Sequence, residues 1–222
     1  MNPPISAEAP DAETPARQRL PAHVRINQIL DAALEAFIAE GFASTRIDDI
    51  ARLAGISKGG IYTHFKSKDE LFEALLERSL TPLSAEEHAA PLDGPVTVNV
   101  LIERVIDRMY EHLANRRTVQ TLRLLVADGT WLPQRVAKWR RAAIEPFLAT
   151  IEKLMRIGVA QGTLREGVLT KAPWLLVAPG VYAAFWQLIE EEAFSDTLVE
   201  QRRLHIAMAR ELLQPVSEEK QG

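Results

Sequence analysis

The sequence contains no cysteine among its 222 residues. This absence excludes a disulfide framework, cysteine zinc sites and a cysteine nucleophile. It is typical of proteins that fold in a reducing compartment, so we expect a cytoplasmic location. The hydrophobic fraction of 47% is ordinary, and a chain of this length can bury a substantial core without disulfides or metals.

Long apolar runs are also missing. The N-terminus does not resemble a signal peptide, and no apolar stretch of roughly eighteen residues is free of charge. The longest apolar run, residues 174–186, is short and contains Pro179 and Gly180. We therefore expect no membrane span and interpret this run as a buried or interface helix.

Common catalytic motifs are absent as well. The sequence has no glycine-rich phosphate loop, no H-E-x-x-H metal motif and no G-x-S-x-G nucleophile turn. The histidines are scattered, and His64 has no second ligand at a metal-like spacing. We expect no metal, no cofactor and no enzyme activity. Catalysis by dispersed residues is the alternative, and turnover of a metabolite by the pure protein would support it.

Negative charge slightly exceeds positive charge overall, but positive charge is locally concentrated. The net charge is −4, which counts against nucleic-acid binding. Between residues 52 and 68, however, Arg52, Lys58, Lys66 and Lys68 occur without any acidic residue. This segment is predicted to form an anion-binding surface, with a solvated helix face as the alternative.

The first third of the chain changes from proline-rich to helical. Residues 1–21 contain five prolines and are predicted to form a disordered tail. From Arg25 onward apolar residues recur at helical spacing, and Gly41 closes this first helix. Three short helices follow, for which we predict Thr45, Ser57 and Ser67 as N-caps. Asp48 and Glu70 stand three residues after Thr45 and Ser67, as in a capping box.

The short helices form a recognisable supersecondary unit. A helix, a tight turn around Gly55 and a second short helix are typical of a helix-turn-helix. The second of these helices starts with Gly59 and Gly60, each worse than alanine in a helix by roughly 1 kcal/mol. A position that another molecule's backbone must approach closely is one reason to keep such glycines, and simple tolerance in a first turn is the alternative.

The rest of the chain is predicted to be a second, helical domain over residues 83–214, followed by a polar tail at 215–222. Its candidate helices span residues 98–114, 117–128, 133–161, 172–194 and 196–213. There is no alternating strand pattern and no internal repeat. The predicted fold class is all-α, with about nine helices and a domain boundary after residue 82.

Residues 22–82 resemble the N-terminal DNA-binding domain of the TetR family of bacterial transcriptional regulators. The matching residues occur in order and at the spacing of the family. They are Ile29-Leu30-Asp31-Ala32-Ala33, Phe37, Gly41-Phe42, Ile50-Ala51, Ala54-Gly55-Ile56-Ser57, Ile61-Tyr62, His64-Phe65, Lys66-Ser67-Lys68 and Leu71. Beyond this segment, the resemblance extends only to an all-helical region of suitable length.

The resemblance implies a homodimer whose third helices enter the DNA major groove. Carried onto this sequence, it assigns phosphate contacts to Thr45, Arg46 and Lys68. It places Lys58, Gly59, Gly60, Tyr62, Thr63 and His64 on the recognition helix. Because two glycines begin that helix, we expect much of the affinity for double-stranded DNA to come from phosphate contacts.

The family also implies a small-molecule effector in the C-terminal domain. Polar and large apolar side chains there are candidates to bind it, although a core role is the alternative for each aromatic. The candidates are Met109, His112, Arg123, Trp131, Trp139, Phe147, Tyr182 and Trp186. We expect dimerisation through the last two helices, where small residues such as Ala183 and Ala184 would allow close packing.

The sequence therefore predicts a transcriptional repressor that an unknown small ligand releases from its operator. Two alternatives retain DNA binding. One is an activator, and the other is an architectural DNA binder without an effector, which a low ratio of specific to non-specific affinity would favour.

Overall fold

The computed structural model describes residues 21–81, 94–189 and 194–216. These residues are helical apart from short connections and contain no strand, so the all-α prediction is confirmed for them. Within the same ranges, no helix is long and apolar enough to cross a membrane. The predicted N-terminal tail up to residue 20, the boundary region at 82–93 and the C-terminal residues from 217 lie outside the described residues.

The first four helices form a small unit that we call the head, residues 22–81. They are α1 (Ala22–Glu40), α2 (Ile47–Leu53), α3 (Lys58–Tyr62) and α4 (Lys68–Leu80). Gly41 ends α1 and Gly55 makes the turn between α2 and α3, with φ angles of 77° and 65° that side chains disfavour. The predicted helix-turn-helix is therefore confirmed.

The N-caps of the short helices agree with the sequence in two cases of three. The Ser57 hydroxyl accepts a hydrogen bond from the Gly60 N–H, and the Ser67 hydroxyl accepts one from the Glu70 N–H. The Glu70 carboxylate binds the Lys66 N–H rather than that of the cap residue, so the second capping box is only half formed. The predicted Thr45 cap is wrong, because Arg46 occupies this position and makes no side-chain capping bond.

The remaining described chain forms a larger unit that we call the body, residues 94–216. Its helices are α6 (Val98–Leu101), a π-helical turn (Ile102–Asp107), α7 (Arg108–Ala114), α8 (Arg116–Asp128), a 3-10 turn (Gly129–Trp131), α9 (Pro133–Trp139), a second π-helical turn (Arg140–Ile144), α10 (Glu145–Ala160), α11 (Val168–Lys171), a second 3-10 turn (Pro173–Leu176), α12 (Ala178–Ile189) and α13 (Phe194–Leu213). The two π-helical turns join neighbouring helices into the longer helical segments that periodicity predicts over 98–114 and 133–161.

The predicted helix over 172–194 is wrong at its start. The chain instead forms the short α11 and a 3-10 turn before α12 begins at Ala178. The positions of Pro173 and Pro179 explain this, because proline lacks an N–H and is tolerated only in the first turn of a helix. Each proline accordingly lies in the first turn of a separate helical segment.

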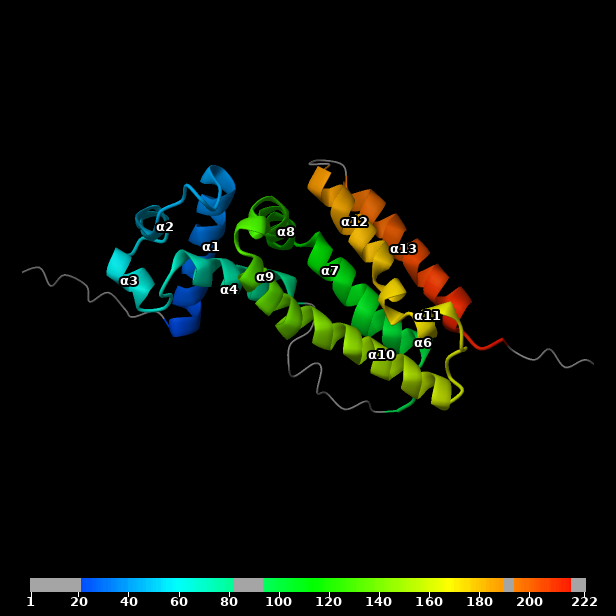
Figure 1. The fold of residues 1–222 in the computed structure, drawn as a ribbon. Coiled ribbons are helices and arrows are strands. Elements are labelled where there is room, and N and C mark those ends of the chain that lie inside the picture. The colour runs from blue at the N-terminus through cyan, green and yellow to red at the C-terminus, as the bar shows by residue number, and fades with distance from the viewer. Residues whose placement is uncertain (1–20, 82–93, 190–193, 217–222) are drawn as a thin grey trace, which may run out of the picture.

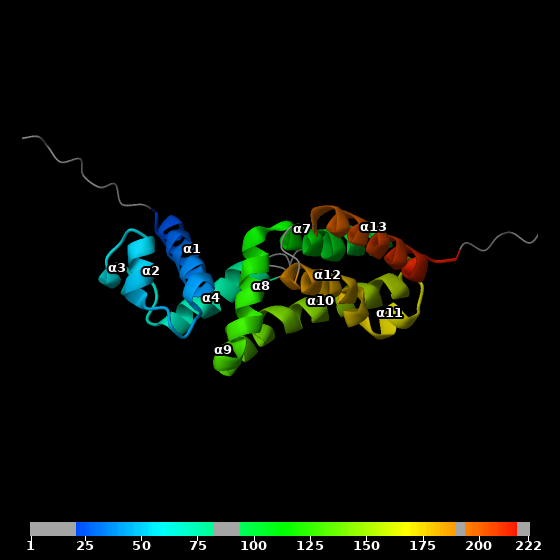
Figure 2. The ribbon, with the colours of Figure 1, turned by 90° about the horizontal axis from the view of Figure 1, so that it is seen from above.

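The head and the body share an apolar core. Figures 1 and 2 show α8 lying against α1 and α4, and α9 lying against α4, while α10, α12 and α13 extend away from the head. Leu124 of α8 and Trp139 of α9 belong to the same buried cluster as Phe37 and Leu71 of the head. A second cluster fills the body between α6, α7, α10 and α13. The body therefore packs against the head through α8 and α9.

A buried carboxylate strengthens this contact. Glu73 on α4 is only 5% exposed, and it pairs with Arg135 at 2.6 Å and with Lys138, both on α9. Burial alone would raise the pKa of Glu73, but the hydrogen bonds and charges of the two cations together lower it. The carboxylate is thus held ionised at the boundary between head and body.

Two further polar contacts join the head to α8. Asp31 on α1 pairs with Arg117 of α8 at 2.7 Å and with Arg78 of α4 at 2.9 Å. The Phe42 N–H, just after α1, donates to Asp128 Oδ2 at 3.1 Å. Both ends of α8 are therefore connected to the head.

Candidate DNA interface and ligand cavity

Helix α3 presents an exposed surface at the end of the head that points away from the body (Figures 1 and 2). Ile61 is fully buried and Phe65 nearly so, which anchors this short helix to α1, α2 and α4 and confirms their expected core role. The predicted recognition residues lie on the opposite side. Lys58, Gly59, Tyr62 and Thr63 are exposed, and Gly60 and His64 are half-buried.

Some polar groups of this surface have partners within the head. Lys58 Nζ lies 2.9 Å from Asp48 Oδ2, and this hydrogen bond raises the pKa of Lys58. The Thr63 hydroxyl donates to the Gly59 carbonyl at 2.9 Å. The Tyr62 side chain is 47% exposed and Arg46 is also exposed, so both can reach an external partner.

The two glycines of α3 are not explained by the fold. Neither has a positive φ, so the backbone conformation does not require glycine. A Cβ atom built on Gly59 would lie 3.9 Å from the Ser57 hydroxyl, and one on Gly60 would lie 3.4 Å from Ile56. These are ordinary van der Waals distances, so internal packing does not require glycine either. Close approach of an external molecule to the backbone, and simple tolerance of glycine in a first turn, remain as the two explanations.

Two predicted phosphate contacts need correction. The Thr45 side chain is 2% exposed, and its hydroxyl donates to the carbonyls of Gly41 and Ala36. Because the side chain is buried and its only proton is already shared between internal carbonyls, Thr45 cannot reach DNA without rearrangement. It stabilises the α1–α2 connection instead.

Lys68 is also occupied internally. Its ammonium donates to the carbonyls of Phe42, Ala43 and Thr45 and lies 4.5 Å from the centre of the Phe42 ring. An ammonium has three protons, and all three are used here. Partial burial lowers the pKa of Lys68, as expected for a cation held against backbone. Lys68 therefore fixes the α1–α2 connection, and it would have to exchange a carbonyl partner to contact phosphate.

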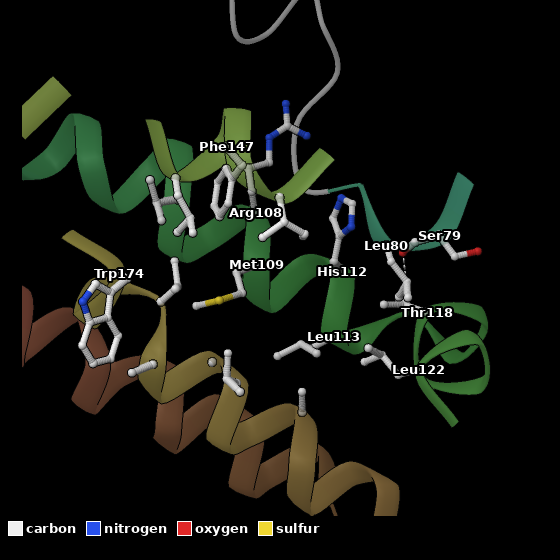
Figure 3. A pocket seen from close by; sticks show the side chains of 18 of the residues that line it. Ser79, Leu80, Arg108, Met109, His112, Leu113, Thr118, Leu122, Phe147 and Trp174 are labelled. Carbon is white, nitrogen blue, oxygen red and sulfur yellow. Dashed lines mark hydrogen bonds between the residues drawn. The ribbon is translucent and has the colours of Figure 1, made fainter. Parts of the chain in front are cut away.

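The body contains a cavity of about 460 Å³, within the usual range for small-molecule sites. It lies between α4, α7, α8, α10 and α12, and apolar side chains make up most of its wall. Figure 3 shows Trp174 at one end and Leu80 with Thr118 at the other, with Met109 between them. The lining residues are Ser79, Leu80, Val105, Arg108, Met109, His112, Leu113, Thr118, Leu122, Trp139, Ile144, Phe147, Leu148, Trp174, Val177, Ala178, Gly180, Val181 and Ala184.

The cavity brings together half of the ligand residues expected from the sequence. Met109, His112, Trp139 and Phe147 line it. The others do not: Trp131 and Tyr182 are exposed, Trp186 packs edge-on against Tyr182 and Phe185, and Arg123 donates to the Gln187 carbonyl. The sequence interpretation missed Ser79, Leu80, Thr118 and Leu122, because nothing in the periodicity of α4 and α8 shows that their ends meet at a cavity.

One face of α12 is apolar and exposed. Val181, Tyr182, Phe185 and Ile189 are each more than half exposed and recur at helical spacing, and Val181 also borders the cavity. The small residues expected to mediate helix packing point inward instead. Ala183 is fully buried, and Ala184 lines the cavity. Large apolar side chains, not small ones, therefore form the outer surface of α12.

Comparison with known proteins matches the head to a family. Residues 29–75 match the family of bacterial regulatory proteins known as the tetR family. The chain is 33% identical over 106 residues to TtgW, an uncharacterised HTH-type transcriptional regulator of Pseudomonas putida, covering 46% of this chain and 72% of TtgW. It is 31% identical over 141 residues to the HTH-type transcriptional regulator SrpR of Pseudomonas putida. That alignment spans 62% of each protein.

Solved structures extend the similarity over the body. SmeT, the repressor of the Stenotrophomonas maltophilia multidrug efflux pump SmeDEF, aligns with a TM-score of 0.67 and 26% identity, covering 86% of this chain and 91% of SmeT. A complex of SmeT with triclosan aligns with a TM-score of 0.71 and 25% identity, covering 87% and 93% of the two chains.

Proposed function

Because this chain belongs to the TetR family of bacterial regulatory proteins, we propose that it is a homodimeric transcriptional repressor that a small ligand releases from DNA. The main support for DNA binding is the exposed surface of α3. A short helix is anchored by Ile61 and Phe65, and its opposite side exposes Tyr62, Thr63 and two glycines that the fold does not need. Such a surface suits insertion into a major groove.

The proposed DNA contacts divide into two groups. Tyr62, Thr63 and His64 face bases or nearby phosphates, while Gly59 and Gly60 let the α3 backbone approach closely. Arg46, exposed at the start of α2, and Lys58 contribute phosphate contacts, which carry most sequence-independent affinity. Lys58 would exchange its Asp48 partner for phosphate.

Dimerisation is proposed through α12 and α13. The exposed apolar face of α12 is the supporting observation, since a contiguous apolar surface of this kind marks an interaction site. A dimer would place two α3 helices on successive major grooves of one DNA face, about 34 Å apart. The spacing of the two heads then decides whether both can bind.

Ligand control is proposed to act through the α4–α8 junction. The chain would divide into a DNA-binding domain at 22–82 and an effector domain at 83–214. The cavity in the body is lined by Ser79 and Leu80 of α4, the helix that enters the head. SmeT, a structural relative, has been solved with triclosan. Coupling of this kind is typically worth about 1–3 kcal/mol between two sites.

A DNA-binding assay tests the proposal. Operators would be selected from random duplexes with the full chain, and affinity measured by fluorescence anisotropy across a salt series. We expect Tyr62→Ala to weaken binding at least about tenfold, a change of about 1.4 kcal/mol. Val168→Ala, which alters a similarly exposed side chain on α11, is the matched control. Parent-like binding by the Tyr62 variant would remove α3 from the interface.

A further inference from the structure

The cavity wall has more polar side chains toward one end than toward the other. Its polar side chains are Ser79, Arg108, His112 and Thr118, and the remaining lining residues are apolar apart from the indole nitrogens of Trp139 and Trp174. Ser79 and Thr118 lie at the end formed by α4 and α8, with His112 beside them, whereas Trp174 lies at the opposite end (Figure 3). A molecule with one polar end would therefore bind in a single direction.

His112 is placed to recognise a polar group. It lies one helical turn after Arg108 on α7, so both side chains leave the same face of the helix. Figure 3 shows both rising from α7 on one side of the cavity, with His112 next to Leu80. An imidazole can donate or accept a hydrogen bond, whereas the guanidinium of Arg108 only donates and is always positive. The Arg108 guanidinium lies 3.9 Å from the exposed Glu111 carboxylate, and its five N–H groups can bind more than one acceptor. This side of the cavity therefore favours oxygen acceptors over a second cation.

The polar end also adjoins the contact between α4 and α8. The Thr118 hydroxyl donates to the Ser79 carbonyl at 3.3 Å, and both residues are buried in the wall. This long bond joins the last turn of α4 to the first turns of α8. A ligand oxygen at His112 would lie next to this hydrogen bond, which connects the two helices at the cavity.

We propose that the effector is an apolar, largely aromatic molecule with a hydroxyl or carboxylate end, and that this end binds at His112 against the Ser79–Thr118 contact. This inference rests on the proposed ligand control and specifies its chemistry. The apolar part would pack against Phe147, Met109 and Trp174, which suit aromatic rings. The polar end would compete for the hydrogen bond between Thr118 and Ser79, and we expect this competition to disturb the α4–α8 junction and release DNA.

Four probes of one shape test the ligand class. Biphenyl, biphenyl-4-methanol, biphenyl-4-carboxylate and biphenyl-4-methylamine differ only at one end. Titration calorimetry with the full chain is expected to give dissociation constants about tenfold lower for the alcohol or the carboxylate than for bare biphenyl, which is the contribution of about one hydrogen bond. The amine is expected to bind more weakly than the alcohol or the carboxylate, because it brings a second positive charge next to Arg108. The proposal would be overturned if the amine bound most tightly, if bare biphenyl bound as tightly as the alcohol and the carboxylate, or if no probe bound.

Variants locate the polar end. His112→Phe should remove the preference for the oxygen-bearing probes, while His23→Phe, at an exposed position on α1, should keep it. Gly180→Ala should weaken all probes, because its Cβ would overlap the Met109 sulfur and force that side chain to move within the cavity wall. An unchanged preference in His112→Phe places the polar end elsewhere and refutes the assignment.

DNA release separates this inference from the proposed function. The oxygen-bearing probes should displace selected operator DNA from the parent chain, and biphenyl should not. If the ligand-free chain binds no duplex, the proposed function fails. If it binds DNA and the amine or bare biphenyl releases it as well as the alcohol does, only the ligand class fails.

Discussion

Replacing Gly59 and Gly60 with alanine should separate folding stability from DNA binding. Each glycine costs roughly 0.5–1 kcal/mol in a helix relative to alanine, because it loses more backbone freedom on folding. Among the described residues, the new methyl groups would meet nothing closer than 3.4 Å. We therefore expect each single variant to be more stable by about 0.5–1 kcal/mol, a rise in melting temperature of roughly 1–4 °C for a chain of this size.

The effect on DNA should have the opposite sign. If the α3 backbone approaches phosphates or base edges, a methyl group at either position occupies space that DNA needs. Operator affinity should fall about tenfold or more, measured by fluorescence anisotropy. The change removes no charge, so the slope of log K against log salt should stay constant. Arg46→Ala should instead reduce the slope by about one unit, as expected for a lost phosphate contact.

The stability and the DNA affinity of each glycine variant must be considered together. A variant that is more stable and binds DNA less tightly supports an external reason for the glycines. A variant that is more stable and binds DNA as the parent does would show that the glycines are merely tolerated. A less stable variant would contradict the packing argument, since the structure leaves room for each methyl group.

Four further predictions follow from the same contacts. Lys68→Met should destabilise the head by roughly 2–3 kcal/mol in urea unfolding, because three carbonyls lose their charged donor, and unchanged stability would contradict this role. Glu73→Gln should cost about 1–3 kcal/mol, because Arg135 and Lys138 lose a buried carboxylate, whereas Glu35→Gln on the exposed face of α1 should be neutral. Phe185→Glu should yield monomers in sedimentation velocity and weaken operator binding, while Val168→Glu should remain dimeric; dimers in both would move the interface away from α12. Burial lowers the pKa of His205 below the ordinary 6.5, so the unfolded chain binds a proton more readily and stability should fall as the pH drops below about 6.5. Melting curves of His205→Gln should show a shallower acid slope, and identical slopes would exclude this ring as the cause.

Much of the head can be predicted from the sequence because its signals are local. Apolar spacing identifies the helices, and serine at an N-cap acts on an N–H three residues away, so the Ser57 and Ser67 caps are predicted correctly. Gly41 and Gly55 mark turns because φ is positive there. The buried roles of Ile61 and Phe65 follow from the same short-range pattern.

Local signals fail where a side chain binds a partner other than the one that its residue type suggests. Thr45 is a residue type that often caps helices, but it points inward to the Ala36 and Gly41 carbonyls. Lys68 lies in a locally positive segment, yet its ammonium binds carbonyls more than twenty positions earlier. The partners of Lys68 depend on how α4 packs beside the α1–α2 connection, and those of Thr45 depend on how the chain turns after α1; periodicity describes neither.

The sequence by itself determined the all-helical class, the helix-turn-helix and the family, since these rest on spacing and on an ordered motif within about fifty residues. Only the tertiary structure decided which residues share a cavity, which face of α12 is exposed, and how Glu73, Asp31 and Asp128 join the head to the body. The physical reason is the distance along the chain over which each interaction acts. Helix formation and capping act between residues a few positions apart, whereas a cavity or an ion pair between helices depends on the packing of segments that lie tens of residues apart in the chain.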